Sequence, residues 1–216
     1  MTGLLLLLIG FLLIWVPDVS FVGDLLIFIG IIFLWLGRHE FAEPHPRNVV
    51  RGSLLVLASI LLAVGLAIWF VAAIVGAAFS AGPSATPSSL SASITSALGV
   101  FVVGAIVLEI LLLLGEIWIV YALADRVVRE LLWAAFAAQM AISVILLAII
   151  YPRISGVVQQ SVNGTAVNTG PITAFQTQIE IYSLLNAIPA LMFAYSFYQI
   201  RERLKREPVT ATVTPA

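Results

Sequence analysis

A long stretch without charge constrains the fold of this chain more than any other feature of its sequence. From Gly52 to Leu108 there is no Asp, Glu, Lys or Arg, and further apolar runs lie before and after this stretch. A helix needs about 20 apolar residues to cross about 30 Å of hydrocarbon, and it satisfies its own backbone hydrogen bonds there. The sequence therefore predicts an all-α, multi-pass helical membrane bundle.

The composition excludes several other classes of protein. The chain is 62% hydrophobic and only 10% charged, whereas a soluble domain carries about 25% charged residues. Its net charge of −1 gives no sign of a nucleic-acid partner. Because the sequence has no cysteine, disulfides, cysteine-ligated metals and thiol catalysis are excluded.

We expect six membrane-spanning helices in a single bundle, residues 1–207, followed by a disordered cytoplasmic tail, residues 208–216. The six predicted ranges are 3–16, 23–37, 50–79, 96–123, 131–151 and 178–200. The first two helices, of about 14 residues each, reach only about 21 Å. They are expected either to thin the bilayer locally or to pair as a shallow hairpin. The apolar N-terminus has no basic region and no cleavage site, so we expect it to stay in the membrane.

The first two predicted helices resemble each other at an offset of 20 residues. The matched pairs are Gly3/Gly23, Leu5/Leu25, Leu6/Leu26, Ile9/Ile29, Gly10/Gly30 and Trp15/Trp35. Either an internal duplication or the leucine-rich composition accounts for these matches. The matched Gly10 and Gly30 would let two helices approach closely, and Pro17-Asp18 would form the turn between them.

The basic residues predict the orientation. With the N-terminus in the cytoplasm, nine of the ten Lys and Arg residues fall in cytoplasmic connections or in the C-terminal tail, and Arg153 is the exception. Cytoplasmic loops of membrane proteins carry an excess of Lys and Arg. We therefore expect a cell-membrane protein with six crossings, rather than five or seven, and with both termini in the cytoplasm.

Two external connections have distinct predicted structures. Residues 80–93 are small, uncharged and rich in Ser and Pro, which is typical of a flexible linker. Residues 157–168 carry Asn163-Gly164 between apolar and polar positions, which favours a type I′ turn and a small β-hairpin. The same dipeptide begins the glycosylation sequon Asn163-Gly164-Thr165, so both interpretations of this loop remain open.

One acid falls in the middle of a predicted membrane helix. Glu109 lies near the centre of 96–123, where an ionised carboxylate is costly, and no Lys or Arg is predicted inside a membrane segment to pair with it. It is therefore either a neutral hydrogen-bonding acid or an ion stabilised by water or a bound cation. Counting from the centres of the next two helices places Gln139 and Asn186 at the same depth.

Helix six adds two further features near Asn186. Pro189 has no N–H and leaves the carbonyl of Leu185 without its helical partner, and Tyr182 lies one turn before Asn186 on the same face. The hypothesis is a polar mid-membrane cavity for a proton or a small cation, lined by Glu109, Gln139, Asn186 and Tyr182. The alternative is that these groups only form hydrogen bonds between helices.

A second acid follows on the same helix. Glu116 lies seven residues after Glu109 and therefore on the same helix face. It is a further candidate for the ion site. Alternatively it lies at the cytoplasmic interface beside Trp118 and Tyr121, because these aromatic side chains favour the level of the lipid headgroups.

The connection from residue 38 to 47 holds both histidines of the chain, His39 and His45, together with Glu40 and Glu43. A His-Glu-x-x-His zinc motif is not formed, because Glu43 stands where the second histidine belongs. We expect a solvated loop, and neither a metal nor any other cofactor. Because no histidine follows position 45, a serine nucleophile has no partner base, and we expect that the protein is not an enzyme.

Residues 3–45 carry the pattern G-L-L-L-L-L-I-G, V-P-D, G-D-L-L-I-F-I-G and L-G-R-H-E-F. This pattern resembles the N-terminal hairpin of uncharacterised prokaryotic, largely archaeal, multi-pass membrane proteins. The resemblance implies a prokaryotic cell membrane and no particular activity.

Two functions remain open after the sequence analysis. The first is a transporter or channel-like protein that uses Glu109 as its proton or cation site. The second is a non-catalytic structural or partner-binding subunit of a membrane complex. The expected partners are the lipid bilayer, a proton or small cation, and another membrane protein or a second copy of the chain.

Overall fold

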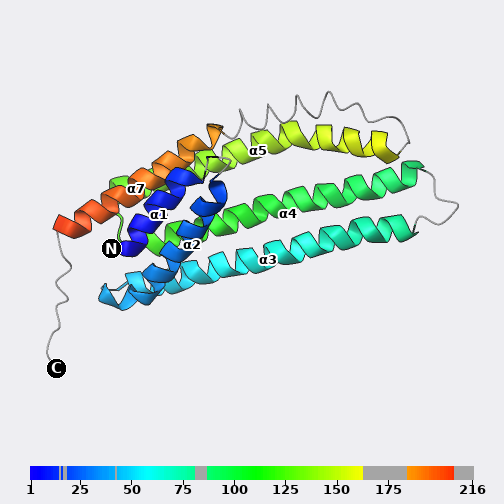
Figure 1. Ribbon diagram of the computed structural model, residues 1–216. Coiled ribbons are helices and arrows are strands. Elements are labelled where there is room, and N and C mark those ends of the chain that lie inside the picture. Colours follow the sequence, from blue (N-terminus) through cyan, green and yellow to red (C-terminus); the bar gives the residue numbers. More distant parts are fainter. Residues whose placement is uncertain (15, 17–18, 42, 81–86, 163–183, 207–216) are drawn as a thin grey trace.

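The chain is described by a computed structural model at residues 1–14, 16, 19–41, 43–80, 87–162 and 184–206. Over these residues the secondary structure is helical and contains no strand. The elements are α1 (Thr2–Leu13), α2 (Ser20–Leu36), a 3-10 turn η1 (Arg38–Glu40), α3 (His45–Ser80), α4 (Pro87–Tyr121), α5 (Arg126–Val162) and α7 (Ala187–Arg206). Figure 1 shows their arrangement.

Three long helices form the framework of the molecule. Helices α3, α4 and α5 have 36, 35 and 37 residues, so each is about 50 Å long at 1.5 Å per residue. Within the described part of the chain, these three are long and apolar enough to cross a membrane. The fold is therefore that of a helical membrane bundle, as the sequence predicts.

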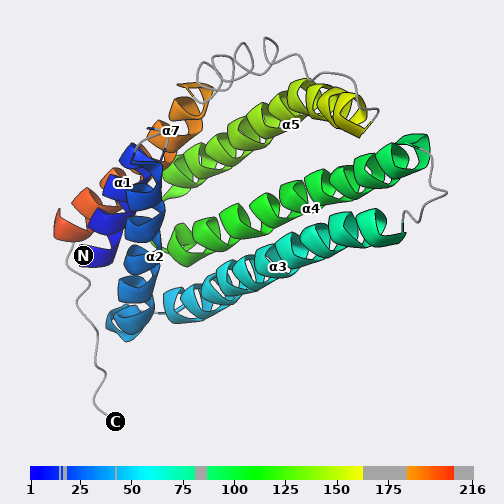
Figure 2. The same ribbon diagram turned by 45° about the vertical axis from the view of Figure 1, so that its right-hand side comes forward.

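Three shorter helices gather at one end of the long ones. In both views, α1, α2 and α7 lie at the end of the molecule where α3 begins and α4 ends (Figures 1 and 2). Helices α1 and α2, of 12 and 17 residues, pack against each other as an antiparallel pair. The prediction of two short helices paired as a hairpin is confirmed.

Glycines permit this close pairing. A Cβ atom added to Gly3 would lie 2.8 Å from the carbonyl oxygen of Gly30, and one added to Gly10 would lie 2.8 Å from that of Gly23. Antiparallel packing thus pairs each glycine of α1 with one glycine of α2. The expected role of Gly10 and Gly30 in close approach is correct, but they do not contact each other. Their partners are Gly23 and Gly3.

A second glycine contact fixes α4 against α3. A Cβ atom added to Gly52 would lie 2.5 Å from the carbonyl oxygen of Gly115, and one added to Gly115 would lie 2.8 Å from that of Gly52. This backbone approach occurs one residue before Glu116. It therefore sets the distance from α3 at which that acid is held.

Arginines join the helix ends at the same end of the bundle. Arg129 of α5 donates a hydrogen bond from Nε to the carbonyl oxygen of Tyr121, at 3.1 Å, and its guanidinium lies 4.6 Å from the centre of the Tyr121 ring. Arg203 of α7 donates to the carbonyl oxygen of Leu123. Tyr121 is the last residue of α4 and Leu123 lies in the connection that follows, so these two arginines tie the end of α4 to α5 and to α7.

Two predicted connections differ from the structure. Residues 157–162 belong to α5, so the predicted β-hairpin over 157–168 is wrong in its first half. Extending an existing helix adds one hydrogen bond per residue, whereas an isolated hairpin is only marginally stable. The predicted linker over 80–93 is also too long, because α4 begins at Pro87, and proline is well tolerated in the first turn of a helix.

Several predicted features lie outside the described residues. They are the turn at Pro17-Asp18, the sequon at Asn163, Tyr182 and the tail 208–216. Of the sixth predicted crossing, 178–200, the described part is interrupted at Asn186, and α7 begins at Ala187.

We expect Gly23→Ala to destabilise the protein. The new Cβ atom would lie 2.7 Å from the backbone nitrogen of Ile14 and 2.8 Å from the carbonyl oxygen of Gly10. Overpacking of this kind costs about 1–3 kcal/mol, so the apparent unfolding temperature in one detergent should fall. The matched control is Gly65→Ala in α3, since no described atom lies within 4 Å of its added Cβ. Equal stability of the two variants would contradict the glycine contact.

Candidate functional site

A cavity lies among the described helices near the tip of the α1–α2 hairpin. Its volume is about 680 Å³, and residues of all six described α-helices contribute to its lining. Most of the lining is apolar. The polar residues that line it are Ser20, Asp24, Glu109, Glu116, Gln139 and Asn186. We call it the acid cavity, because three of these six side chains are carboxylic acids.

The acid cavity lies deep along the long helices. Glu109 precedes the end of α4 at Tyr121 by 12 residues, which corresponds to about 18 Å. Half of a hydrocarbon layer is about 15 Å thick. Ser20 lines the same cavity and is the first residue of α2, so the start of α2 lies beside this cavity.

Glu109 joins α4 to α5 through two hydrogen bonds. Gln139 donates from Nε2 to Oε1 of Glu109 at 2.9 Å, and Ser143 donates from Oγ to the same oxygen at 2.8 Å. The structure thus brings together Glu109 and Gln139. The sequence analysis places these two residues at the same depth by counting from the helix centres. Ser143 was missed by the sequence analysis. Its position four residues after Gln139 on the same helix face is the signal that could have found it.

Glu116 is the most enclosed acid of the cavity. The residue is 6% exposed, and its Oε2 atom has no hydrogen-bond partner among the described residues. The neighbouring Trp118 is exposed, so the two side chains lie on different sides of α4. The structure therefore places Glu116 inside the bundle with Glu109, and not on the outer surface beside the aromatic residues.

Asp24 is the acid that the sequence analysis missed. It lies in the second turn of α2 and lines the cavity at an exposed position. It is the one acid between residues 20 and 36, and a charge within so apolar a helix is the signal that could have found it. Its place in the site depends on the hairpin, which brings the start of α2 to the middle of the bundle.

Asn186 lines the acid cavity at the start of α7. The backbone N–H of Ala190 donates to the carbonyl oxygen of Asn186 at 3.2 Å, which marks the beginning of the helix. Pro189 falls in the first turn, where a missing N–H removes no helical hydrogen bond. The Oδ1 atom of Asn186 is buried and has no hydrogen-bond partner within the described ranges. Tyr182, the remaining predicted residue, lies outside them.

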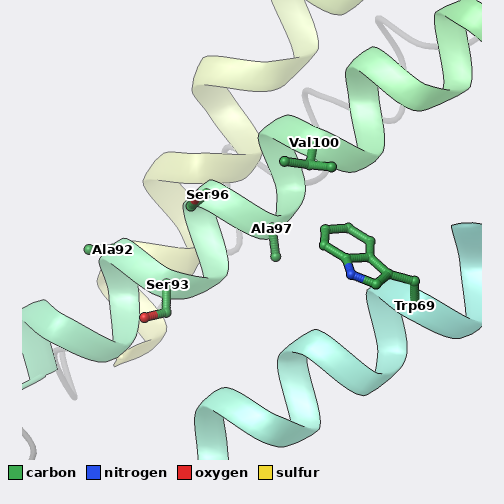
Figure 3. A pocket seen from close by; sticks show the side chains of 6 residues that line it. All are labelled: Trp69, Ala92, Ser93, Ser96, Ala97 and Val100. Carbon is green, nitrogen blue, oxygen red and sulfur yellow. The ribbon is translucent and has the colours of Figure 1, made fainter.

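A second pocket lies between the far halves of α3 and α4. Its volume is about 530 Å³, and Figure 3 shows Trp69 of α3 across from Ala97 and Val100 of α4. The serine Ser93 lines this pocket and donates to the carbonyl oxygen of Ser89, at 3.1 Å. No charged residue lines it. The acid cavity is therefore the better candidate for a functional site.

The connection around the two histidines differs in part from the expected solvated loop. His39, Glu40 and Glu43 are exposed, but His45 is 1% exposed and lies edge-on to Phe41, with 4.8 Å between the ring centres. His45 begins α3, and its ring is buried against Phe41. In the part of the chain that the structure describes, no group of three or more His, Asp or Glu side chains has the arrangement of a metal site.

Comparisons with protein-family profiles, with curated proteins and with solved structures found no match to this chain. The resemblance of residues 3–45 to prokaryotic membrane proteins therefore stays a prediction. The interpretation of the site depends on its geometry alone.

We expect Ser143→Ala to weaken the contact between α4 and α5. The variant removes one of the two hydrogen-bond donors to the half-buried Glu109, and a hydrogen bond contributes about 0.5–1.5 kcal/mol to stability. Thermal unfolding in one detergent should therefore occur at a lower temperature than in the unmodified protein. Ser93→Ala is the control, because Ser93 bonds only within its own helix at an exposed position. If both variants unfold like the parent protein, the Glu109 bridge is not stabilising.

Proposed function

We propose that the protein is a membrane transporter that binds a proton or a cation in the acid cavity and moves it across the cell membrane. One observation carries this proposal. Glu116 is buried, and its Oε2 atom has no described partner, although two further acids and no basic residue line the same cavity. A buried anion without a positive partner is strongly destabilised. A proton or a cation supplies the missing positive charge.

The arrangement of the helices supports transport. Ion and substrate sites of many transporters lie at the bilayer midplane, where short or interrupted helices end. Here the tip of the α1–α2 hairpin and the break before α7 both meet α4 at the acid cavity. Such ends supply polar groups at a depth where an unbroken helix offers none.

We propose that α1 and α2 form a re-entrant hairpin that enters and leaves the membrane on the cytoplasmic side. Nine of the ten Lys and Arg residues belong to helix ends and connections at the end of the bundle that also holds the start of α1 and the end of α7 (Figure 1). Basic residues favour the cytoplasmic side. Both termini are then cytoplasmic, as we expect from the sequence, but α1 and α2 do not cross.

The alternative function, a structural or partner-binding subunit, accounts for only part of the site. A bridge between α4 and α5 explains Glu109, because Gln139 and Ser143 satisfy it. It does not explain Glu116, because the Oε2 atom of this residue forms no hydrogen bond to another helix in the described structure. The proposal also includes our expectation that the protein is not an enzyme, since binding and release of a cation require no chemical step.

Reconstitution into liposomes tests the transport proposal. Uptake of protons and of sodium, each followed with a fluorescent dye, should exceed uptake into protein-free liposomes. For Glu116→Gln, the uptake should fall about tenfold, because the amide cannot balance a positive charge. The control is Glu130→Gln, since Glu130 is an exposed acid that pairs with Arg126 at 3.0 Å. Uptake that is equal in both variants and the parent protein would overturn the proposal.

Cysteine labelling tests the re-entrant hairpin. The chain has no cysteine of its own, so single substitutions can be labelled without background. In right-side-out vesicles, Val16→Cys near the hairpin tip should not react with a membrane-impermeant maleimide added outside. Ser89→Cys, at the opposite end of α4 from the basic residues, should react. Labelling of Val16→Cys from outside would show that α1 and α2 cross the membrane.

A further inference from the structure

The size of the acid cavity restricts the kind of cation that it fits. A water molecule occupies about 30 Å³ of liquid, and pockets for small organic molecules have volumes of about 300–1,000 Å³. The acid cavity, with about 680 Å³, falls within the second range. A site that strips an inorganic ion of water surrounds it closely with oxygen ligands, whereas a cavity of this volume also has room for an organic molecule.

The lining favours a ligand with an apolar body. Eleven of the 17 lining residues are apolar. A hydrated ion would therefore form few favourable contacts with most of the lining. Three of the apolar residues are aromatic: Phe11, Phe28 and Phe193. The rings of Phe11 and Phe193 pack against each other with 5.0 Å between their centres. Aromatic faces attract organic cations as well as apolar groups.

The carboxylates are arranged to receive one positive group on such a ligand. Glu109 and Glu116 lie seven residues apart on α4, about 10.5 Å along the helix. The Oε1 atom of Glu109 already accepts two hydrogen bonds, whereas the Oε2 atom of Glu116 has no described partner. The positive group therefore belongs near Glu116, and the apolar body extends toward the phenylalanines.

The rim of the cavity lies on the outer surface of the bundle. Phe28 of α2 and Ile60 of α3 line the cavity and are nevertheless 45% and 38% exposed. Exposed apolar surface on membrane helices faces lipid. Access between α2 and α3 thus leads from the lipid to the carboxylates, a route that suits an amphiphilic molecule.

From these observations we infer that the ligand of the acid cavity is a lipophilic organic cation that reaches Glu116 from the lipid between α2 and α3. The inference rests on the proposed transport function and specifies the substrate class of the same site. It adds two requirements that a proton or an inorganic ion does not impose. The ligand carries a positive charge on an apolar body that can pack against the phenylalanine rings, and the rim residues control its access.

Binding of tetraphenylphosphonium to the purified full-length protein tests the inference. We expect saturable binding of the radiolabelled cation in mild detergent, and no competition by triphenylphosphine oxide, which is similarly aromatic but neutral. Tetramethylammonium, which is charged but lacks an aromatic body, should compete only weakly. Glu116→Gln should bind tetraphenylphosphonium about tenfold more weakly, since it removes the negative charge, whereas Glu130→Gln should bind it normally.

A rim variant keeps the test decisive if Glu116→Gln does not fold. Ile60→Trp adds bulk at the mouth of the cavity on an exposed position, so the protein should fold and lose tetraphenylphosphonium binding. The matched control is Ile68→Trp on the same helix, which is 66% exposed and does not line the cavity. Equal binding by both tryptophan variants would overturn the inference.

The two proposals fail in different ways. If tetraphenylphosphonium does not bind but proton or sodium uptake still depends on Glu116, the organic ligand is wrong and the transport proposal stands. If tetraphenylphosphonium binds at Glu116 but nothing is transported, the cavity is a binding site for organic cations and the transport proposal fails. If neither is observed, both proposals are overturned.

Discussion

The structure depends on the cost of placing carboxylic acids in an environment where water is scarce. A charged group in the middle of a bilayer is destabilised by at least about 2.5 kcal/mol, and three acids line one cavity here without a basic residue. The fold offsets part of this cost locally. Gln139 and Ser143 donate to Glu109, and the first turns of α2 and α7, whose N-termini carry partial positive charge, contribute to the lining.

Glycine contacts determine where these acids lie. The Gly52–Gly115 contact brings the backbones of α3 and α4 together immediately before Glu116, and the Gly10–Gly23 contact does the same for α1 and α2 immediately before Asp24. Both acids line the acid cavity, so two of its three carboxylates directly follow a close backbone contact between helices.

Much of the site follows from counting along helices, because the rise per residue is nearly constant. This is why Glu109, Gln139 and Asn186 could be placed at one depth from the sequence. Asp24 could not, because the same counting treats residues 23–37 as a crossing helix and puts Asp24 at a membrane surface. The error over residues 157–162 has a related origin. A short apolar-polar alternation fits a strand, but it is too brief to outweigh the continuation of α5.

The two glutamates of α4 have the same chemistry but different surroundings, and this difference divides their roles. Glu109 is held by donors from α5, so releasing it would break a contact between helices as well as a contact with any ligand. Glu116 lines the same cavity, and its buried Oε2 atom is engaged by no described group. A transport cycle requires a positive charge to bind and to leave without dismantling the bundle. In the transport cycle that we propose, Glu116 would exchange its cation while Glu109 keeps α4 in place, so that the pair would combine a stable framework with a reversible site.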